Sequence, residues 1–153
     1  MTNSLDDIAN DARSYLIIGS NTTEQHPVLG MCIRQAVRRR GAKLIIADPR
    51  RIPLAKFAAL HLRHKPGSDI ALLNAIMHVL ITEDLHDKEF VAQRTEGFEE
   101  LKALLEKYTL EYAEKITDVP ASDIRKAARL LAANRPGALI LSLIHISEPT
   151  RPY

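Results

Sequence analysis

The sequence predicts an α/β fold, with a Rossmann-like parallel sheet followed by a helical layer. Two short apolar runs, SYLIIGS at 14–20 and AKLIIAD at 42–48, each end at a polar turn. Such runs are typical of strands that are buried on both faces. The segment between them, residues 28–40, carries apolar side chains at helical spacing. One helix between two buried strands makes a right-handed βαβ unit with parallel strands.

The helix expected over residues 28–40 has a recognisable end. The basic run Arg38–Arg40 falls in its last turn, where cations complement the helix dipole, and Gly41 follows as the C′ residue. We interpret the three arginines as a solvated helix end rather than a nucleic-acid patch. The expected inner face consists of Leu29, Ile33, Ala36 and Val37.

The chain then passes from strands to helices. Residues 51–58 predict a short helical turn, and ALHLRH at 59–64 predicts a third strand. A strongly amphipathic helix is expected over Asp69–Thr82, and further helical segments occupy 86–95, 97–108 and 120–137. The inner face expected for the helix over Asp69–Thr82 consists of Ile70, Leu73, Ile76, Met77 and Leu80.

Composition limits the function classes. The net charge of +2 is too small to indicate a nucleic-acid partner, and Cys32, the single cysteine, excludes internal disulfides and cysteine-ligated iron–sulfur clusters within this chain. No run of about 20 apolar residues indicates a membrane segment. The polar N-terminus resembles no targeting signal, so we expect a cytoplasmic protein.

We expect no regular element before the first strand, as in a chain that begins within a larger fold or carries a free arm.

The three loops that follow the predicted strands are the best candidates for a binding site. They read GSNTTEQHP, DPRR and KPGSD. Ligands of open parallel sheets bind outside the carboxyl ends of the strands. We therefore expect the three loops to converge on one edge of the sheet.

The first two loops have residue types that suit a nucleotide. Gly19 allows a phosphate close to the backbone, and Asp48 is placed to accept from ribose hydroxyls, or else forms an Asp-Pro turn. Arg50 and Arg51 can pair with phosphate or stack on a base. Because the first loop is not G-x-G-x-x-G, it does not indicate an ordinary dinucleotide dehydrogenase. Neutral hydrogen-bonding side chains in that loop are Ser20, Asn21, Thr22 and Thr23.

In the third loop, Asp69 can accept from the ring N–H and the exocyclic amine of guanine, or it can simply cap the adjacent helix. His61 and His64 are three apart on a predicted strand and point to opposite faces, so a metal pair is not indicated. Cys32 is interpreted as a buried helix residue. We find no catalytic apparatus in the sequence, and no metal site.

Five blocks occur in the order and spacing of a known family: IGSN, HP, DPRR, PGSD with ALLNA, and RTEGFEE. Through them, residues 2–140 resemble the molybdopterin oxidoreductase family, and within it the alpha subunits of molybdenum- or tungsten-dependent formate dehydrogenases. The resemblance implies that this segment, residues 1–140, is a Rossmann-like part of a larger oxidoreductase that binds one molybdopterin guanine dinucleotide. The resemblance implies that the phosphates and the pterin side contact Gly19, Ser20, Asn21 and Glu24, with His26 beside them. It implies that the ribose and guanosine end contacts Asp48 and Arg50. Guanine itself would be held by Gly67 and Asp69.

The same resemblance implies what lies outside this chain. Family members of this type carry an iron–sulfur region, a metal-ligating cysteine or selenocysteine and a histidine upstream, and a second dinucleotide site downstream. Partners would be the rest of the alpha subunit and electron-transfer subunits, and we expect this chain alone to be inactive. A stand-alone nucleotide-binding module and a sibling such as a nitrate reductase remain alternatives.

The tail after Ile140 does not continue the family pattern. Residues 141–151, LSLIHISEPTR, resemble the translation of transposase adapter DNA used in short-read sequencing. We therefore expect GALI to begin a sheet strand and residues 141–153 to be a non-native tail. A natural divergent C-terminus is the alternative, and the DNA that encodes these residues distinguishes the two.

Overall fold

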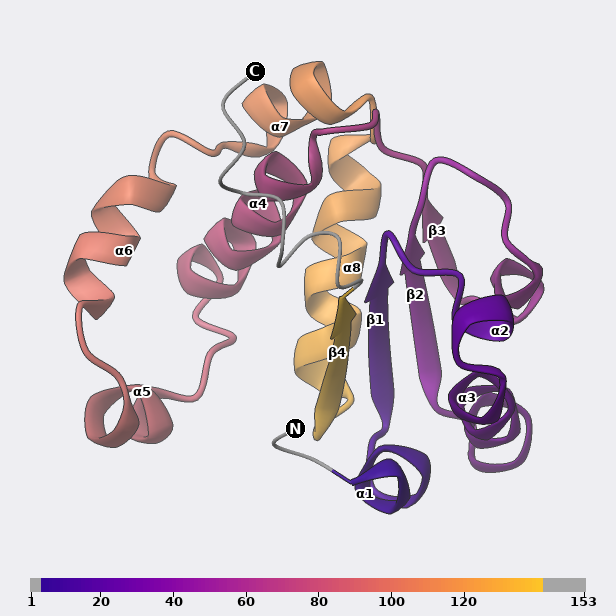
Figure 1. Ribbon diagram of the computed structural model, residues 1–153. Coiled ribbons are helices and arrows are strands. Elements are labelled where there is room, and N and C mark those ends of the chain that lie inside the picture. The colour runs from indigo at the N-terminus through magenta and orange to yellow at the C-terminus, as the bar shows by residue number, and fades with distance from the viewer. Residues whose placement is uncertain (1–3, 142–153) are drawn as a thin grey trace. The chain divides into compact units, whose positions relative to one another are not determined.

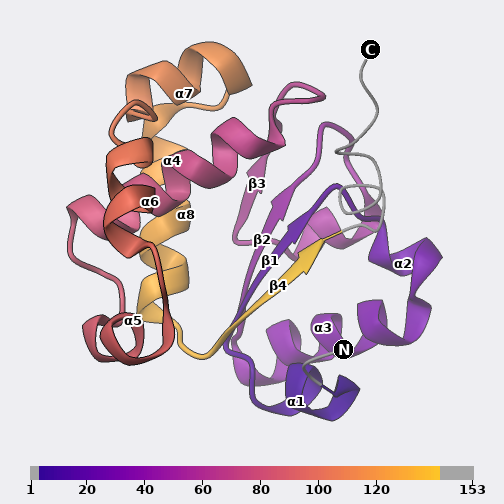
Figure 2. The ribbon, with the colours of Figure 1, turned by 60° about the vertical axis from the view of Figure 1, so that its left-hand side comes forward.

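The computed structural model describes residues 4–141, which form two compact units (Figures 1 and 2). The first, here the sheet unit, comprises residues 4–62 and 134–141, and the second, the helical unit, comprises residues 63–133. The sheet unit contains α1 (Leu5–Asn10), β1 (Ser14–Ile18), α2 (Thr22–Gln25), α3 (Pro27–Arg40), β2 (Lys43–Ala47), the 3-10 helix η1 (Pro53–Phe57), β3 (Leu60–Leu62) and β4 (Gly137–Leu141). The helical unit contains α4 (Asp69–Thr82), α5 (Lys88–Arg94), α6 (Phe98–Leu105), α7 (Leu110–Thr117) and α8 (Ala121–Ala133).

The sheet has four parallel strands in the order β3-β2-β1-β4 (Figure 1). Ile18, the last residue of β1, is in register with Ala47 of β2 on one side and with Leu141 of β4 on the other. The predicted α/β fold with a parallel sheet is therefore confirmed, and GALI does begin a strand. Residues 142–153, which hold the rest of the predicted tail, lie outside the described residues.

The core of the sheet unit lies between the sheet and the helices α1 and α3, which cover one face of it (Figure 2). Every residue of β1 is buried, as are the last four residues of β2, so both faces of these strands are removed from water. The unbroken apolar runs predicted this burial correctly. The side chains that meet the two helices include Tyr15, Ile17, Leu44 and Ile46 from the strands and Ile33 and Ala36 from α3.

The expectation that no element precedes the first strand is wrong, because α1 does. Ser4 and Asp7 form a capping box, in which each side chain accepts the other residue's backbone N–H. At the other end of α1, the guanidinium of Arg40 donates to the backbone oxygens of Ala9 and Asn10. One local contact and one tertiary contact thus satisfy some of the orphan groups of a helix too short to be stable by itself.

The inner face predicted for α4 is also largely wrong, although the bounds of this helix are those expected. Ile76 is buried as predicted, whereas Ile70 is 70% exposed. The helix is apolar around most of its circumference, so the spacing of apolar residues does not single out one face. The residues of α4 that are buried are Ala71, Leu72, Ala75, Ile76 and Val79.

Candidate functional site

The carboxyl ends of three strands meet at one edge of the sheet unit. The N–H of Gly19, just after β1, donates to the oxygen of Ala47 at 3.0 Å, and the N–H of Asp48, just after β2, donates to the oxygen of Leu62 at 3.2 Å. The chain proceeds from β1 to β2 to β3 on one side and returns with β4 on the other side of β1. The reversal creates a topological switch point between β1 and β4, where open α/β sheets bind their ligands.

The first loop lies at this edge and is partly helical. Gly19 has φ +60°, a conformation that favours glycine, and α2 begins three residues later at Thr22. The hydroxyl of Ser20 donates to Oε1 of Gln25 at 3.1 Å. Oδ1 of Asn21 and Oγ1 of Thr22 are buried, and neither has a hydrogen-bond partner among residues 4–141. The edge therefore holds two polar atoms that the fold itself leaves unsatisfied.

A glycine that the sequence did not single out holds α2 in place. A Cβ at Gly30 of α3 would lie 3.2 Å from the backbone oxygen of Thr22 and 3.3 Å from Cα of Thr23. The absence of a side chain thus lets the backbone of α2 approach α3. Glu24 and His26, two further predicted contacts, are exposed at and just after α2.

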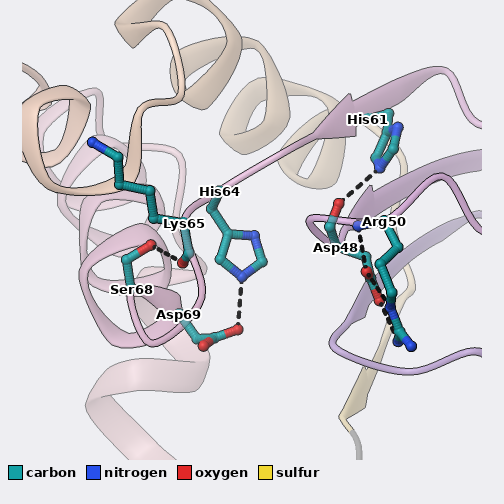
Figure 3. A network of polar contacts seen from close by, with 7 residues as sticks. All are labelled: Asp48, Arg50, His61, His64, Lys65, Ser68 and Asp69. Atoms are coloured by element: carbon teal, nitrogen blue, oxygen red, sulfur yellow. Dashed lines mark hydrogen bonds and ion pairs between the residues drawn. The ribbon is translucent and has the colours of Figure 1, made fainter.

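The second loop places an exposed cation beside a buried carboxylate (Figure 3). Oδ1 of Asp48 accepts from the backbone N–H of Arg50 at 2.8 Å and from its Nε at 3.2 Å, and Oδ2 accepts from Nη2 at 3.3 Å. The Asp48 side chain is 2% exposed, and that of Arg50 is 70% exposed. The turn that was one alternative for Asp48 is therefore present, and its carboxylate fixes Arg50.

Acidic neighbours hold the guanidinium of Arg50 in its charged form. Hydrogen bonding to the carboxylate of Asp48 raises the pKa of Arg50, as does the charge of that carboxylate, and the charge of Glu24 adds a smaller effect. Arg51 is exposed as well. His61 of β3 donates from Nε2 to the backbone oxygen of Asp48 at 2.9 Å, which further ties the turn to the sheet (Figure 3).

The third loop belongs to the helical unit. Gly67 has φ +81°, and a Cβ there would meet open space, so the backbone conformation is what requires glycine. The N-cap of α4 is Ser68 rather than Asp69, so the capping alternative for Asp69 is wrong. Oδ1 of Asp69 lies 2.8 Å from Nε2 of His64 (Figure 3). His64, which is 2% exposed, was absent from the predicted site.

The donor set fits part of a nucleotide cofactor. The carboxyl edge holds neutral hydroxyl and amide groups, a glycine with positive φ and an anchored arginine, which are groups that bind phosphate and sugar oxygens. Over residues 4–141, no three histidine, cysteine, aspartate or glutamate side chains are grouped so as to hold a metal ion. In the same range, no helix is long and apolar enough to cross a membrane.

Comparison with known proteins gives one consistent result. The chain is 48% identical to the F420-dependent formate dehydrogenase 1 subunit alpha of Methanococcus maripaludis, over 92% of this chain and 20% of the relative. It is 46% identical to formate dehydrogenase H of Escherichia coli, over 92% of this chain and 19% of the relative. The solved structure of acetylene hydratase from Pelobacter acetylenicus matches with a TM-score of 0.78 and 33% identity, over 91% of this chain and 20% of that one.

The chain thus spans about a fifth of the length of the relatives it matches. The model of the molybdopterin oxidoreductase family matches residues 1–144, which is nearly the whole chain. The parallel sheet and its polar carboxyl edge agree with that match. The chain belongs to the molybdopterin oxidoreductase family.

Proposed function

We propose that the chain is the part of a formate dehydrogenase-like molybdenum or tungsten oxidoreductase that binds one molybdopterin guanine dinucleotide. The relatives named formate dehydrogenase are 48% and 46% identical to it. The observation that carries the proposal is the pair of unpartnered atoms, Oδ1 of Asn21 and Oγ1 of Thr22, buried at the carboxyl edge of the sheet. Buried polar atoms without partners are rare in native proteins, and a ligand bound at this edge would supply a partner.

In the sheet unit, the first loop would bind the phosphates and the pterin side. Gly19 keeps the backbone open to a phosphate, and Ser20 and Asn21 supply hydrogen-bonding groups. Glu24 and His26 extend the same surface along α2. The second loop would bind the ribose and guanosine end, where Arg50 makes the contact and Asp48 holds the guanidinium in place.

In the helical unit, Gly67 and Asp69 would hold guanine. The carboxylate of Asp69 is 19% exposed, so part of it remains open to a ligand. A carboxylate accepts from two adjacent donors, which matches the ring N–H and the exocyclic amine of guanine. Adenine lacks this pair of donors, so the same carboxylate selects guanine.

The bound cofactor supplies the molybdenum or tungsten centre for the two-electron oxidation of formate to carbon dioxide in the whole protein. The contribution of this chain is to bind and orient the cofactor. The remainder of the alpha subunit, with its own iron–sulfur cluster, and separate electron-transfer subunits are the proposed partners, and the cytoplasm is the proposed compartment. The similarity to acetylene hydratase supports a role in binding the cofactor rather than in choosing the reaction, because a protein named for a different reaction contains a similar segment.

Calorimetric titration of the purified chain with guanosine diphosphate and adenosine diphosphate tests the proposal. We expect at least a roughly tenfold preference for the guanine nucleotide, since a well-placed pair of hydrogen bonds to a base is worth about 1–3 kcal/mol. Asn21→Ala and Arg50→Ala should both weaken binding. Arg34→Ala is the control, because Arg34 is also exposed but lies on α3.

Equal affinity for the two nucleotides would instead favour the stand-alone nucleotide-binding module. Formate-dependent dye reduction by the purified chain is expected to be absent, and its detection would contradict the division of roles proposed here.

A further inference from the structure

The contact between His64 and Asp69 joins a fully buried ring to a partly exposed carboxylate (Figure 3). The side chain of His64 is 1% exposed and that of Asp69 is 19% exposed. Nε2 of the ring and Oδ1 of the carboxylate are 2.8 Å apart. The contact lies wholly within the helical unit, in the loop that leads into α4.

The surroundings of the ring define its protonation. An ionised carboxylate only accepts hydrogen bonds, so the hydrogen lies on Nε2 of His64. Nδ1 is buried and has no hydrogen-bond partner among the described residues. The geometry thus gives Nε2 an acceptor and gives Nδ1 none, so the ring donates to the carboxylate through Nε2.

Other hydrogen bonds also hold the loop. The N–H of Lys65 donates to the backbone oxygen of Thr117 at 2.9 Å, and the hydroxyl of Ser68 donates to the oxygen of Lys65 at 2.6 Å. An apolar side chain of similar size would fill the same volume without burying an unpaired nitrogen. What such a side chain would lose is the hydrogen bond to Asp69.

We propose that His64 is a positioning residue, which holds the carboxylate of Asp69 in the orientation that receives the donor edge of guanine. Oδ1 is held by the buried ring, and the open lone pairs of the carboxylate remain for the base. The inference rests on the proposed role of Asp69, and it adds the residue that fixes the guanine-selecting group. His64 itself touches no ligand, since its remaining nitrogen is buried.

Nitrogen NMR of the histidine rings tests the contact without any nucleotide. We expect His64 to show a hydrogen on Nε2, and Asp69→Ala should shift or broaden the Nε2–H signal. A ring without a hydrogen on Nε2, or a signal indifferent to Asp69→Ala, would overturn the proposal.

Titration with guanosine diphosphate tests the consequence. His64→Leu should lower the affinity about fivefold, the effect of freeing one side chain that binding must then order. His64→Gln should stay within about twofold of the unmodified chain, because the amide nitrogen of glutamine replaces Nε2 as donor. His78→Leu is the matched control, since His78 is a partly buried histidine of the same unit whose Nδ1 lies 3.0 Å from the backbone oxygen of Leu105.

The outcomes separate this inference from the proposed function. Unchanged affinity in Asp69→Ala, or no binding by the unmodified chain, contradicts the proposed function. The NMR measurement then still tests the hydrogen bond between His64 and Asp69. Weakened binding in Asp69→Ala but not in His64→Leu contradicts the positioning role. Equal losses in His64→Leu and His64→Gln would mean that His64 only supports the loop structurally, which also overturns it.

Discussion

The sheet unit and the helical unit differ in how far their interiors follow from the sequence. In the sheet unit, strands β1 and β2 are buried on both faces, so the prediction does not depend on choosing a face. In the helical unit, α4 is apolar around most of its surface, and the choice of face decides which residues are buried. Apolar content therefore predicts burial in a parallel strand, whereas in such a helix only the packing partners determine it.

Both units bury polar atoms without partners, and they differ in their paired charges. In the sheet unit these atoms include oxygens of Asn21 and Thr22, and in the helical unit they include Nδ1 of His64, counted within residues 4–141. In the helical unit, Glu83 also accepts from Arg129 at 2.7 Å and lies 3.3 Å from Arg125. These ion pairs join α8 to the residue that ends α4.

The largest effect is expected from truncating the interior of α4. Ile76→Ala should lower the free energy of unfolding by about 3 kcal/mol, because it leaves a cavity at a side chain that is 3% exposed. Ile70→Ala, in the same helix, should change it by less than about 0.5 kcal/mol, because Ile70 is 70% exposed. Urea denaturation followed by circular dichroism measures both. Similar losses in the two variants would contradict the assigned face.

A medium effect is expected from one hydroxyl in the sheet unit. The hydroxyl of Tyr15 donates to the backbone oxygen of Ile8 at 2.6 Å and so connects β1 to α1. Tyr15→Phe should cost about 1 kcal/mol of unfolding free energy, because it leaves a carbonyl without its donor. Tyr112→Phe in the helical unit is the control, since Tyr112 is 44% exposed, and it should have almost no effect.

The same tyrosine gives a pH dependence. Burial raises the pKa of Tyr15 above its ordinary value of 10.0, with Arg40 opposing the shift. A group with a raised pKa in the folded state contributes stability that is present below its ordinary pKa and is lost as the pH rises through the folded value. Alkaline unfolding above pH 10.0 should therefore be less steep in Tyr15→Phe. An identical pH profile in the two proteins would contradict this assignment.

The meeting of the first two loops at one edge of the sheet could be predicted from the sequence, but the contacts within the loops could not. Parallel strands carry their carboxyl ends to one edge, so chain order alone placed Gly19 and Asp48 together. The pairing of Asp69 with His64 depends on the path of a turn, which has no period to reveal it. The position of the third loop relative to the first two stays a prediction.

The element that was missed in the first loop has the same explanation. Helix α2 has only four residues, too few to show a helical spacing of apolar side chains. It forms because Gly30 allows close packing against α3, a tertiary contact that residue spacing within the loop cannot reveal. A short helix such as α2 is thus determined by the residues it packs against. The bounds of a long helix such as α4 can be predicted from its own sequence.

The smallest effect is expected from the ion pairs of the helical unit. Hydrogen bonding to Arg129 lowers the pKa of Glu83 below its ordinary value of 4.5, and the charges of Arg129 and Arg125 act in the same direction. Because the folded pKa is depressed, the contribution is present above pH 4.5 and is lost as the pH falls through the folded value. Glu83→Gln should therefore be less stable than the unmodified chain at neutral pH and equally stable in acid.

Salt separates this electrostatic effect from a change in packing. Both arginines are more than half exposed, at 51% and 61%, so salt at about 1 M should remove most of the difference. Glu111→Gln is the matched control, an exposed glutamate in the first turn of α7, whose replacement should show only the smaller dependence on pH and salt that the helix dipole causes. If the difference caused by Glu83→Gln persists unchanged in acid and in high salt, then Glu83 joins α4 and α8 through packing rather than through its charge.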